Sequence, residues 1–423
     1  MRTEYTPLKS RLTCRKFVTP RWWCIIFTLF IGSWCVSTTT FAQKKQISNA
    51  KENVKKGNNL ENAEKSMVEL LKDSANRQND KIWTILFDAL KKQYDQGNEK
   101  IYLKQKYDTA NLFNIASRMF QQMEAYDSID AQPDAKGRVK LNMRKDNAAL
   151  LNRLRPNLLS GGHYFVRKKK YAEAYQLFDQ YIDAAQQPLF ASYRYMEKDK
   201  NIPMASYWAV YCAYKMQDSK NTLNHTYQAL KDTTHYEMML QYLSDTYRRD
   251  ADTTRYVNTL VEGFQKYPLS LFFYSHLIEH YSQTGQWDEA LALTDKALNV
   301  DSTNQVFWQT KGSILLNLGD FQKCFDISQR LISKNDSLPE AWLNAGLSKF
   351  NMGVKFDKTS LASSKQRAAT LKYYKEALPY LEKYRAMRPD RKDKWALPLY
   401  TIYLNLNMGK EFDEIDKIKN EYR

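Results

Sequence analysis

The chain has 423 residues, of which 26% are charged and 43% hydrophobic, values that exclude a disordered or collagen-like protein. Only 13 Gly and 11 Pro stand beside 29 Tyr, 19 Phe and 9 Trp, and this balance favours helices packed through aromatic side chains over a turn-rich sheet. The net charge of +17 favours acidic partners. Since Lys and Arg are dispersed along the chain, a solvated basic surface is the simpler interpretation, anionic lipid or polysaccharide is the alternative partner, and no nucleic-acid partner is expected.

The first 42 residues have the composition of a secretory leader. Residues 1–21 carry six Lys or Arg and one Glu, and residues 22–36 carry no charge. Thr40 and Ala42 then supply the small residues that a signal peptidase requires at positions −3 and −1. The sequence therefore predicts a signal peptide over 1–42, cleavage after Ala42, and export to the periplasm, the outer envelope or the medium. An uncleaved leader that anchors the chain is the alternative, and it is the only membrane association expected.

Beyond the leader only Cys212 and Cys324 remain, which excludes a disulfide framework and a cysteine-rich metal site. Residues 43–59 are rich in Lys and Asn, and we expect this polar segment to be disordered or frayed. Helical periodicity begins at Leu60, and residues 60–154 read as divergent helices with one degenerate repeat around Ala110.

The most regular part of the chain is a repeat of constant length. Residues 271–304 contain two helical patterns on either side of Gly285, and Ala290 is the small residue of the second pattern. The equivalent positions of the neighbouring units are Thr222, Tyr256 and Cys324, and the interval from each to the next is the same, about 34 residues. Four units in phase are far more specific than one match.

A helix–turn–helix unit of about 34 residues resembles the tetratricopeptide repeat (TPR). From about residue 90 onward the chain is similar to exported bacterial TPR proteins. This resemblance implies an all-α, right-handed solenoid of about six to seven helix pairs. We expect the array over 155–390, with insertions near 187–202 and 354–370, and capping helices over 391–423.

In TPR proteins the first helix of each unit lines a concave groove, so the resemblance implies a binding surface for a peptide or protein. Transferred by register, the groove positions are Tyr207, Tyr211, Tyr214, Gln241, Asp245, Arg248, Arg249, Glu279, Gln309 and Asn317. Aromatic, Arg and amide side chains of this kind suit an extended peptide. The alternative is that some of them only cover the inner surface. The Lys/Asn clamp that some TPR proteins use for a terminal carboxylate is not reproduced, because Gln309 and Ser313 occupy those positions in one unit.

One string resembles a catalytic motif. His276, Glu279 and His280 match the H-x-x-E-H pattern of certain zinc peptidases, so a zinc hydrolase is a rival hypothesis. The repeat register explains the same residues with His276 and His280 facing neighbouring helices and Glu279 facing the groove. A phosphate-binding loop, a dinucleotide fingerprint and a nucleophile elbow are absent from the sequence. We therefore expect a protein with no catalytic residues, metal or cofactor, and the sequence leaves its oligomeric state open.

Overall fold

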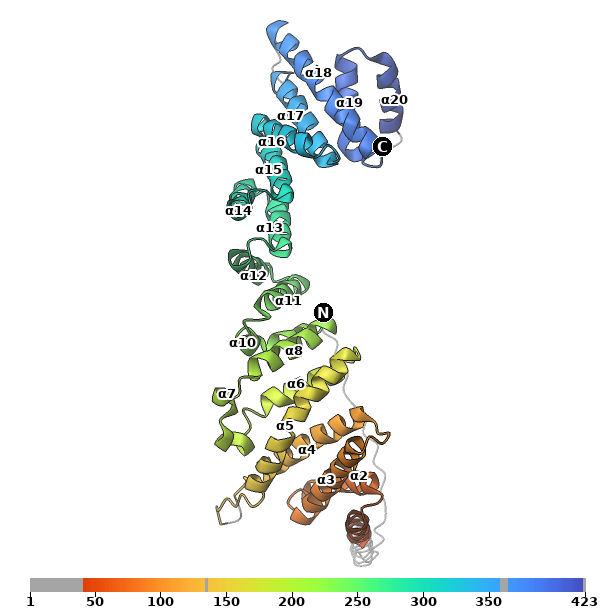
Figure 1. The fold of residues 1–423 in the computed structure, drawn as a ribbon, viewed down its shortest axis with the longest axis vertical. Coiled ribbons are helices and arrows are strands. Elements are labelled where there is room, and N and C mark those ends of the chain that lie inside the picture. The colour runs from red at the N-terminus through yellow and green to blue at the C-terminus, as the bar shows by residue number, and fades with distance from the viewer. Residues whose placement is uncertain (1–40, 134–135, 358–363, 421–423) are drawn as a thin grey trace, which may run out of the picture. The chain divides into compact units, whose positions relative to one another are not determined.

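The computed structural model describes residues 41–133, 136–357 and 364–420, and all regular elements in those ranges are helical. The contacts between residues divide the chain into two units, residues 1–212 and 213–423. The boundary falls inside one helix, α8 (Ile202–Lys215). In each unit, successive helices run back and forth and are joined by short turns (Figure 1).

The first unit begins with a helix over residues 41–56. Its other elements are α2 (Leu60–Leu71), η1 (Ser74–Asn76), α3 (Asp80–Tyr102), α4 (Thr109–Asp130), α5 (Arg144–Arg167), α6 (Tyr171–Asp183), η2 (Pro188–Tyr193), α7 (Tyr195–Lys198) and most of α8. Its core is rich in aromatic rings: Tyr126 on α4 packs against Trp83 and Phe87 on α3, with centroid distances of 5.4 and 5.6 Å. Offset and edge-to-face ring pairs of this kind add to the hydrophobic gain of burial.

The second unit contains the regular repeats. Its elements are α9 (Ser219–Asn224), α10 (Thr226–Ala229), α11 (Tyr236–Arg249), α12 (Thr253–Lys266), α13 (Leu271–Thr284), α14 (Trp287–Val300), α15 (Gln305–Leu318), α16 (Phe321–Lys334), α17 (Pro339–Asp357), α18 (Ser364–Met387), α19 (Lys392–Asn405) and α20 (Gly409–Asn420). At the four positions that set the sequence period, Thr222, Tyr256, Ala290 and Cys324, the residues are all buried. Antiparallel helix pairs that recur at this period are TPR-type units, so the predicted fold class is confirmed.

The turn inside each unit is built in the same way. The residues at positions 217, 251, 285 and 319, which are equivalent in successive units, all have positive φ, and two of them, Gly285 and Gly319, are glycines. A left-handed residue at this place lets the chain leave the first helix and satisfies its last carbonyls. Asp252 and Asp320 then cap the second helix by accepting hydrogen bonds from backbone N–H groups three residues on. The tight turn therefore depends on backbone geometry that recurs at the sequence period.

Tryptophan fixes several of the turns between one helix and the next. The indole Nε1–H of Trp308 donates to the carbonyl of Ser302, and that of Trp342 donates to the carbonyl of Asp336, both at 2.8 Å. These two tryptophans occupy equivalent positions in successive units. Trp83 in the first unit donates in the same way to a carbonyl six residues earlier. A large ring near the start of a helix thus holds the preceding turn, because its single donor satisfies a carbonyl that the turn leaves open.

Several expectations need correction or refinement. Residues 43–59 were expected to be disordered or frayed, but residues 41–56 form a helix. This helix buries Ala50 and Val54, which lie one turn apart. Ile47, on the same helix, is half-buried, and most of the other side chains are polar. The second helix of the Thr222 unit is broken at His225 into α9 and α10.

The insertions take two forms. Residues 187–202 hold the short elements η2 and α7. The insertion near 354–370 lies where α17 and α18 are lengthened to 19 and 24 residues, and residues 358–363 are outside the described residues. Most of the expected leader also falls outside them. No helix in the described part of the chain combines the length and hydropathy needed to cross a membrane.

Candidate functional site

The residues expected to line a groove lie on the first helices of the units, but not all of them are accessible. Tyr207 on α8 is only 5% exposed, so it belongs to the core of the first unit and cannot offer a surface to a partner. Its ring packs against Trp208. Tyr211, one turn later, is half-buried with its ring against Tyr171 and Trp208. Burial, assisted by a hydrogen bond with Tyr171, raises the pKa of Tyr211 to about 12.

In the second unit, four of the expected groove residues form one polar network. The hydroxyl of Tyr214 donates to Oδ2 of Asp245 at 2.8 Å, and Nη2 of Arg248 donates to Oδ1 of the same carboxylate at 3.1 Å. The guanidinium of Arg249 lies 5.6 Å from the centre of the Tyr214 ring. That ring stacks on Tyr242 at 4.4 Å. Burial and the hydrogen bond to Asp245 raise the pKa of Tyr214, so its hydroxyl remains a donor at neutral pH.

Arg248 also reaches into an open hollow between α11, α12 and α13. The hollow has a volume of about 220 Å³ and is lined by Arg248, Ala251, Thr253, Tyr256, His276, Glu279, His280 and Gln283. Burial raises the pKa of Tyr256, and the nearby charge of Arg248 opposes that rise. The lining therefore presents donors from Arg248 and Tyr256 and acceptors from Glu279 on one surface.

The H-x-x-E-H residues lie in this hollow. His276 and His280, which were expected to face neighbouring helices, are half-buried and line it together with residues of α11 and α12, and the exposed Glu279 lines it too. Nδ1 of His276 is 2.8 Å from the carbonyl oxygen of Phe272, so this nitrogen donates a hydrogen bond to it. Among the described residues, the three side chains do not bring their potential ligand atoms together as a metal site requires.

The other expected positions bond mainly within their own helices. Nε2 of Gln241 donates to Glu237 at 3.4 Å, and Nδ2 of Asn317 donates to the carbonyl of Ser313 at 2.8 Å. Gln309 is half-buried, and its carbonyl oxygen accepts from Ser313. Asn317 remains exposed. The first helices α11 and α13 thus meet around one site, whereas Gln309 and Asn317 on α15 are not part of it.

The repeat register did not predict that the second helix, α12, contributes residues to the hollow. Thr253 and Tyr256 line the hollow, although only first helices were expected to do so. The sequence held a signal: Tyr256 occupies the position where the other units have Thr222, Ala290 and Cys324. Tyr256 is 9% exposed, so it is buried there as the smaller residues are, and it is large enough to line the hollow as well.

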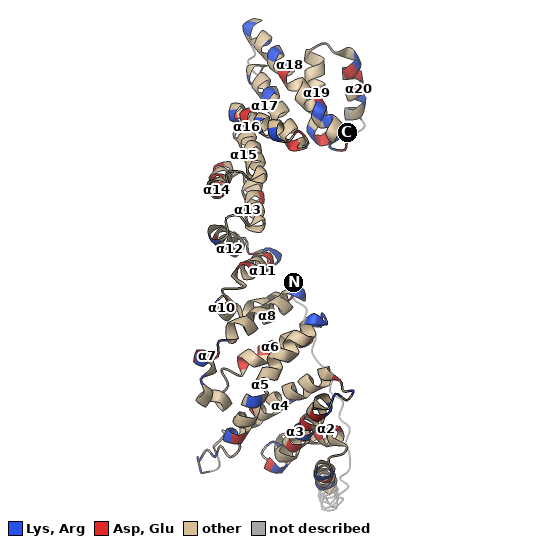
Figure 2. Ribbon diagram, viewed as in Figure 1, with Lys and Arg blue, Asp and Glu red and all other residues tan. Residues whose placement is uncertain are grey.

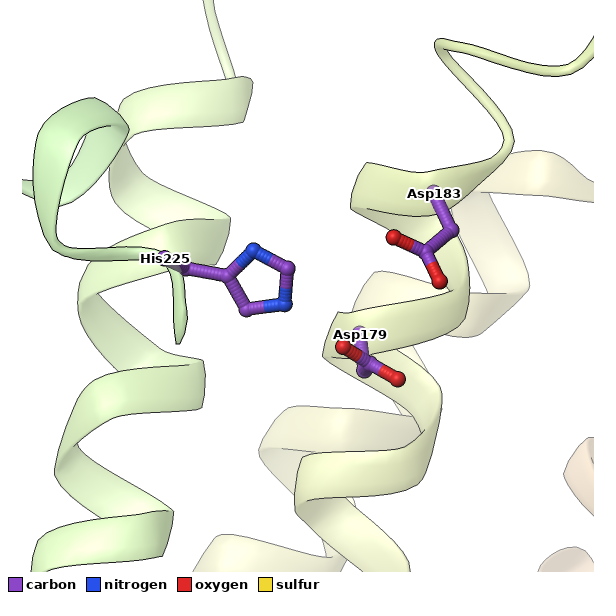
Figure 3. A group of neighbouring side chains, drawn as sticks. All are labelled: Asp179, Asp183 and His225. Atoms are coloured by element: carbon purple, nitrogen blue, oxygen red, sulfur yellow. The ribbon is translucent and has the colours of Figure 1, made fainter. Parts of the chain in front are cut away.

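A second polar feature lies in the first unit. Figure 3 shows Asp179 and Asp183 one turn apart on the same face of α6, and it also draws His225, which belongs to the second unit. Burial and the charges of Asp183 and Asp127 raise the pKa of Glu124, on α4, to about 8. Oε1 of Glu124 is buried without a hydrogen-bond partner. Glu124 therefore carries a proton at neutral pH, and this part of the unit is a place of unfavourable negative charge.

Charge elsewhere is unevenly distributed among the helices. Basic residues outnumber acidic ones by five to one on α5 and by six to two on α18, whereas α3 carries four of each (Figure 2). Many of them form ion pairs one turn apart on the same helix, such as Arg255 with Asp252 and Lys323 with Asp320. Each pair of this kind cancels one basic charge against one acidic charge, so the excess of Lys and Arg remains.

Comparison with known proteins shows that the chain resembles solved TPR structures in fold only. No protein-family model and no curated protein matches the chain. Among solved structures, the C-terminal part of a TPR repeat-containing protein from Cytophaga hutchinsonii is 12% identical, with a TM-score of 0.41 over 61% of this chain and 93% of that one. A TPR repeats protein from Bacteroides fragilis is 16% identical, with a TM-score of 0.31 over 62% and 98%. The TPR2AB domain of yeast Sti1, in complex with pHSP90, is 8% identical, with a TM-score of 0.23 over 63% and 99%. At these values the likeness says nothing about function.

Proposed function

We propose that this protein is a non-catalytic scaffold of the cell envelope, which binds a peptide or protein partner on the face formed by α11, α12 and α13. The observation that carries the proposal is the hollow that adjoins the Tyr214–Asp245–Arg248 network. Tyr and Arg are the side chains that most often dominate the energy of protein interfaces, because they combine large contact area with directed donors. The site therefore has the chemistry of a partner-binding surface.

The polar groups of this face are held in place before any partner arrives. Arg248 is fixed by Asp245, and Glu279 accepts a hydrogen bond from Gln283 at 3.3 Å. Groups that are already ordered lose less conformational entropy on binding. An extended peptide can pair its backbone N–H groups with Glu279 and its carbonyl or carboxylate groups with Arg248. No step in this role requires a metal or a nucleophile.

Binding can be tested with matched charge variants. Arg248→Ala and Glu279→Gln change the hollow, whereas Arg367→Ala removes an equal charge from an exposed position on α18. Partners recovered from an envelope extract by the wild-type protein are identified, purified and titrated against all four proteins. We expect at least a tenfold weaker affinity for Arg248→Ala and Glu279→Gln and an unchanged affinity for Arg367→Ala. Equal affinities for all four proteins would place the binding surface elsewhere.

The envelope location rests on the leader composition alone. Fractionation of the source cells, followed by N-terminal sequencing of the recovered protein, tests it directly. We expect the protein in the envelope or medium with Gln43 as its first residue. An intact Met1 in a membrane fraction would support the anchored alternative, and recovery from the cytoplasm alone would contradict export.

A further inference from the structure

A second hollow, unrelated to the α11–α13 site, lies in the first unit. It has a volume of about 350 Å³ and is bordered by the beginning of α2, the last turns of α3 and the beginning of α4. Six of its twelve lining residues are amides, namely Asn58, Asn59, Asn62, Gln93, Gln96 and Asn111. Ligand sites generally occupy about 300–1,000 Å³, so the hollow has room for a small ligand.

Three of these amides are already oriented by hydrogen bonds. Nε2 of Gln93 donates to Glu64 at 2.8 Å, Nε2 of Gln96 donates to the carbonyl of Gly57 at 2.9 Å, and Nδ2 of Asn111 donates to the hydroxyl of Tyr107 at 3.2 Å. In each case the NH₂ group is used and the carbonyl oxygen is kept as an acceptor. Gln93 is 7% exposed, so its position is also fixed by packing. These bonds turn three flexible side chains into placed acceptors.

The remaining three amides provide groups that no described residue satisfies. The side chains of Asn58, Asn59 and Asn62 are exposed and make no hydrogen bond to the described residues. Asn59 precedes α2 with φ of 48°, and its side chain does not cap the helix. An amide offers both a donor and an acceptor, as a hydroxyl group does. The hollow thus combines placed acceptors with a row of groups that can donate or accept.

The charge and the shape of the hollow exclude several classes of ligand. Glu61 and Lys100 are the only charged residues in the lining, and their charges cancel. A lining without net charge gives no preference for a phosphate, a carboxylate or a metal ion. Leu60 and Tyr107 supply only a small apolar surface, which is too little for the side chains of a bound peptide.

We propose that this hollow binds a neutral saccharide. Sugar hydroxyls both donate and accept, so they match amide groups in pairs, and the apolar face of a sugar ring needs only a small surface such as that of Tyr107. Gly97 is required for the position of Tyr107, because a Cβ at residue 97 would lie 2.7 Å from the Tyr107 ring. The absence of a side chain on α3 therefore lets Tyr107 sit at the edge of the hollow.

Saturation-transfer NMR on the purified protein tests the proposal. The probes are methyl glucoside, N-acetylglucosamine, methyl mannoside and cellobiose, each at millimolar concentration, with acetyl-trialanine amide as a peptide probe. We expect transfer to at least one sugar, and no transfer to the peptide that Asn62→Ala removes. Asn62→Ala and Asn111→Ala should each lower the affinity for that sugar at least tenfold. Gly97→Ala should also lower this affinity, because it displaces Tyr107.

The control is Asn317→Ala, which removes an exposed amide from α15 in the other unit and should leave sugar binding unchanged. Circular dichroism of each variant separates a lost site from a lost fold, and only folded variants are compared. Transfer to none of the sugars would overturn the proposal. So would sugar binding that survives both Asn62→Ala and Asn111→Ala. Peptide transfer that Asn62→Ala removes would assign the hollow to a polypeptide ligand and overturn the saccharide proposal. None of these results bears on the α11–α13 face.

Discussion

Arg155 on α5 and Asp199, directly after α7, form an ion pair that is almost completely withdrawn from water, with side chains 6% and 11% exposed. The guanidinium is also enclosed by two rings, 3.7 Å from the centre of Tyr181 and 3.9 Å from that of Tyr195. Asp199 accepts a second hydrogen bond, from the hydroxyl of Tyr181. This cluster ties the insertion over 187–202 to the α5–α6 helix pair.

The first prediction concerns the loss of this pair. Arg155→Ala leaves Asp199 buried without its counter-charge, which typically costs about 3–5 kcal/mol. We expect a fall of that size in the free energy of unfolding, measured by urea titration. The control is Arg194→Ala, because Arg194 and its partner Glu197 are 58% and 59% exposed and such a pair contributes about 0–1 kcal/mol. Equal losses in the two variants would show that burial does not set the strength of the Arg155 pair.

The second prediction is the dependence of this pair on acid. Burial acts to raise the pKa of Asp199, but hydrogen bonds from Tyr181, the Asn201 backbone and Arg155 outweigh it, so the net shift is downward. The stabilisation is therefore complete above the ordinary aspartate pKa, near 4, and disappears as pH falls through the lower value of the folded state. Asp199→Asn should be less stable than wild type at pH 7, and the difference should shrink below about pH 4. A difference that is constant from pH 7 to pH 2 would contradict this account.

The third prediction has the opposite sign. Burial, together with the charges of Asp183 and Asp127, raises the pKa of Glu124 to about 8, so the folded protein holds a proton there that the unfolded chain loses at lower pH. Stability should therefore fall as pH rises from about 4.5 to about 8, by about 1.4 kcal/mol for each unit of pKa difference. Glu124→Gln keeps the neutral shape at every pH. We expect it to be more stable than wild type at pH 8 and equal at pH 4, as measured by thermal unfolding at both values.

The fourth prediction uses the left-handed turn positions. Gln217 has φ of 59°, whereas the equivalent residue three units later is Gly319, with φ of 78°. A residue with a Cβ is strained in this region by roughly 1 kcal/mol relative to Gly. Gln217→Gly should therefore stabilise the protein by about 1 kcal/mol, and Gly319→Ala should destabilise it by a similar amount. Nothing lies within 4 Å of a Cβ placed at Gly319, so its cost would come from backbone strain alone. The free energies of unfolding of both variants are measured by chemical denaturation. A change of the same sign in both variants would refute the prediction.

The repeat architecture was predictable because it depends on local features. The spacing of Thr222, Tyr256, Ala290 and Cys324 places one buried residue at the same point of each second helix, and all four are buried in the structure. Period and helix type follow from side-chain size and from turn residues such as Gly285, which act within a few residues of themselves. No long-range information is needed to recognise them.

The partner site was only partly predictable. Register placed Asp245 and Arg248 on one helix face, where the two are indeed paired, but the bond from Tyr214 to Asp245 joins two different helices. Register also put Tyr207 on the surface, whereas it is buried, because the packing of α8 against its neighbours decides which face is covered.

The sequence by itself determined that this chain is an all-α array of evenly spaced helix pairs, because helix propensity, turn geometry and the spacing of small residues are local. Only the tertiary structure decided which polar groups come together: Arg248, His276 and Glu279 in the lining of one hollow, Arg155 and Asp199 in an ion pair, and the amides of α2, α3 and α4 around a second hollow. Those groups come from different helices, and small differences in how each pair packs move a side chain from the surface to the core. The physical reason is that the repeat period of the sequence fixes the order of the helices. The sizes of individual side chains fix the distance between packed helices and the rotation of each helix about its axis.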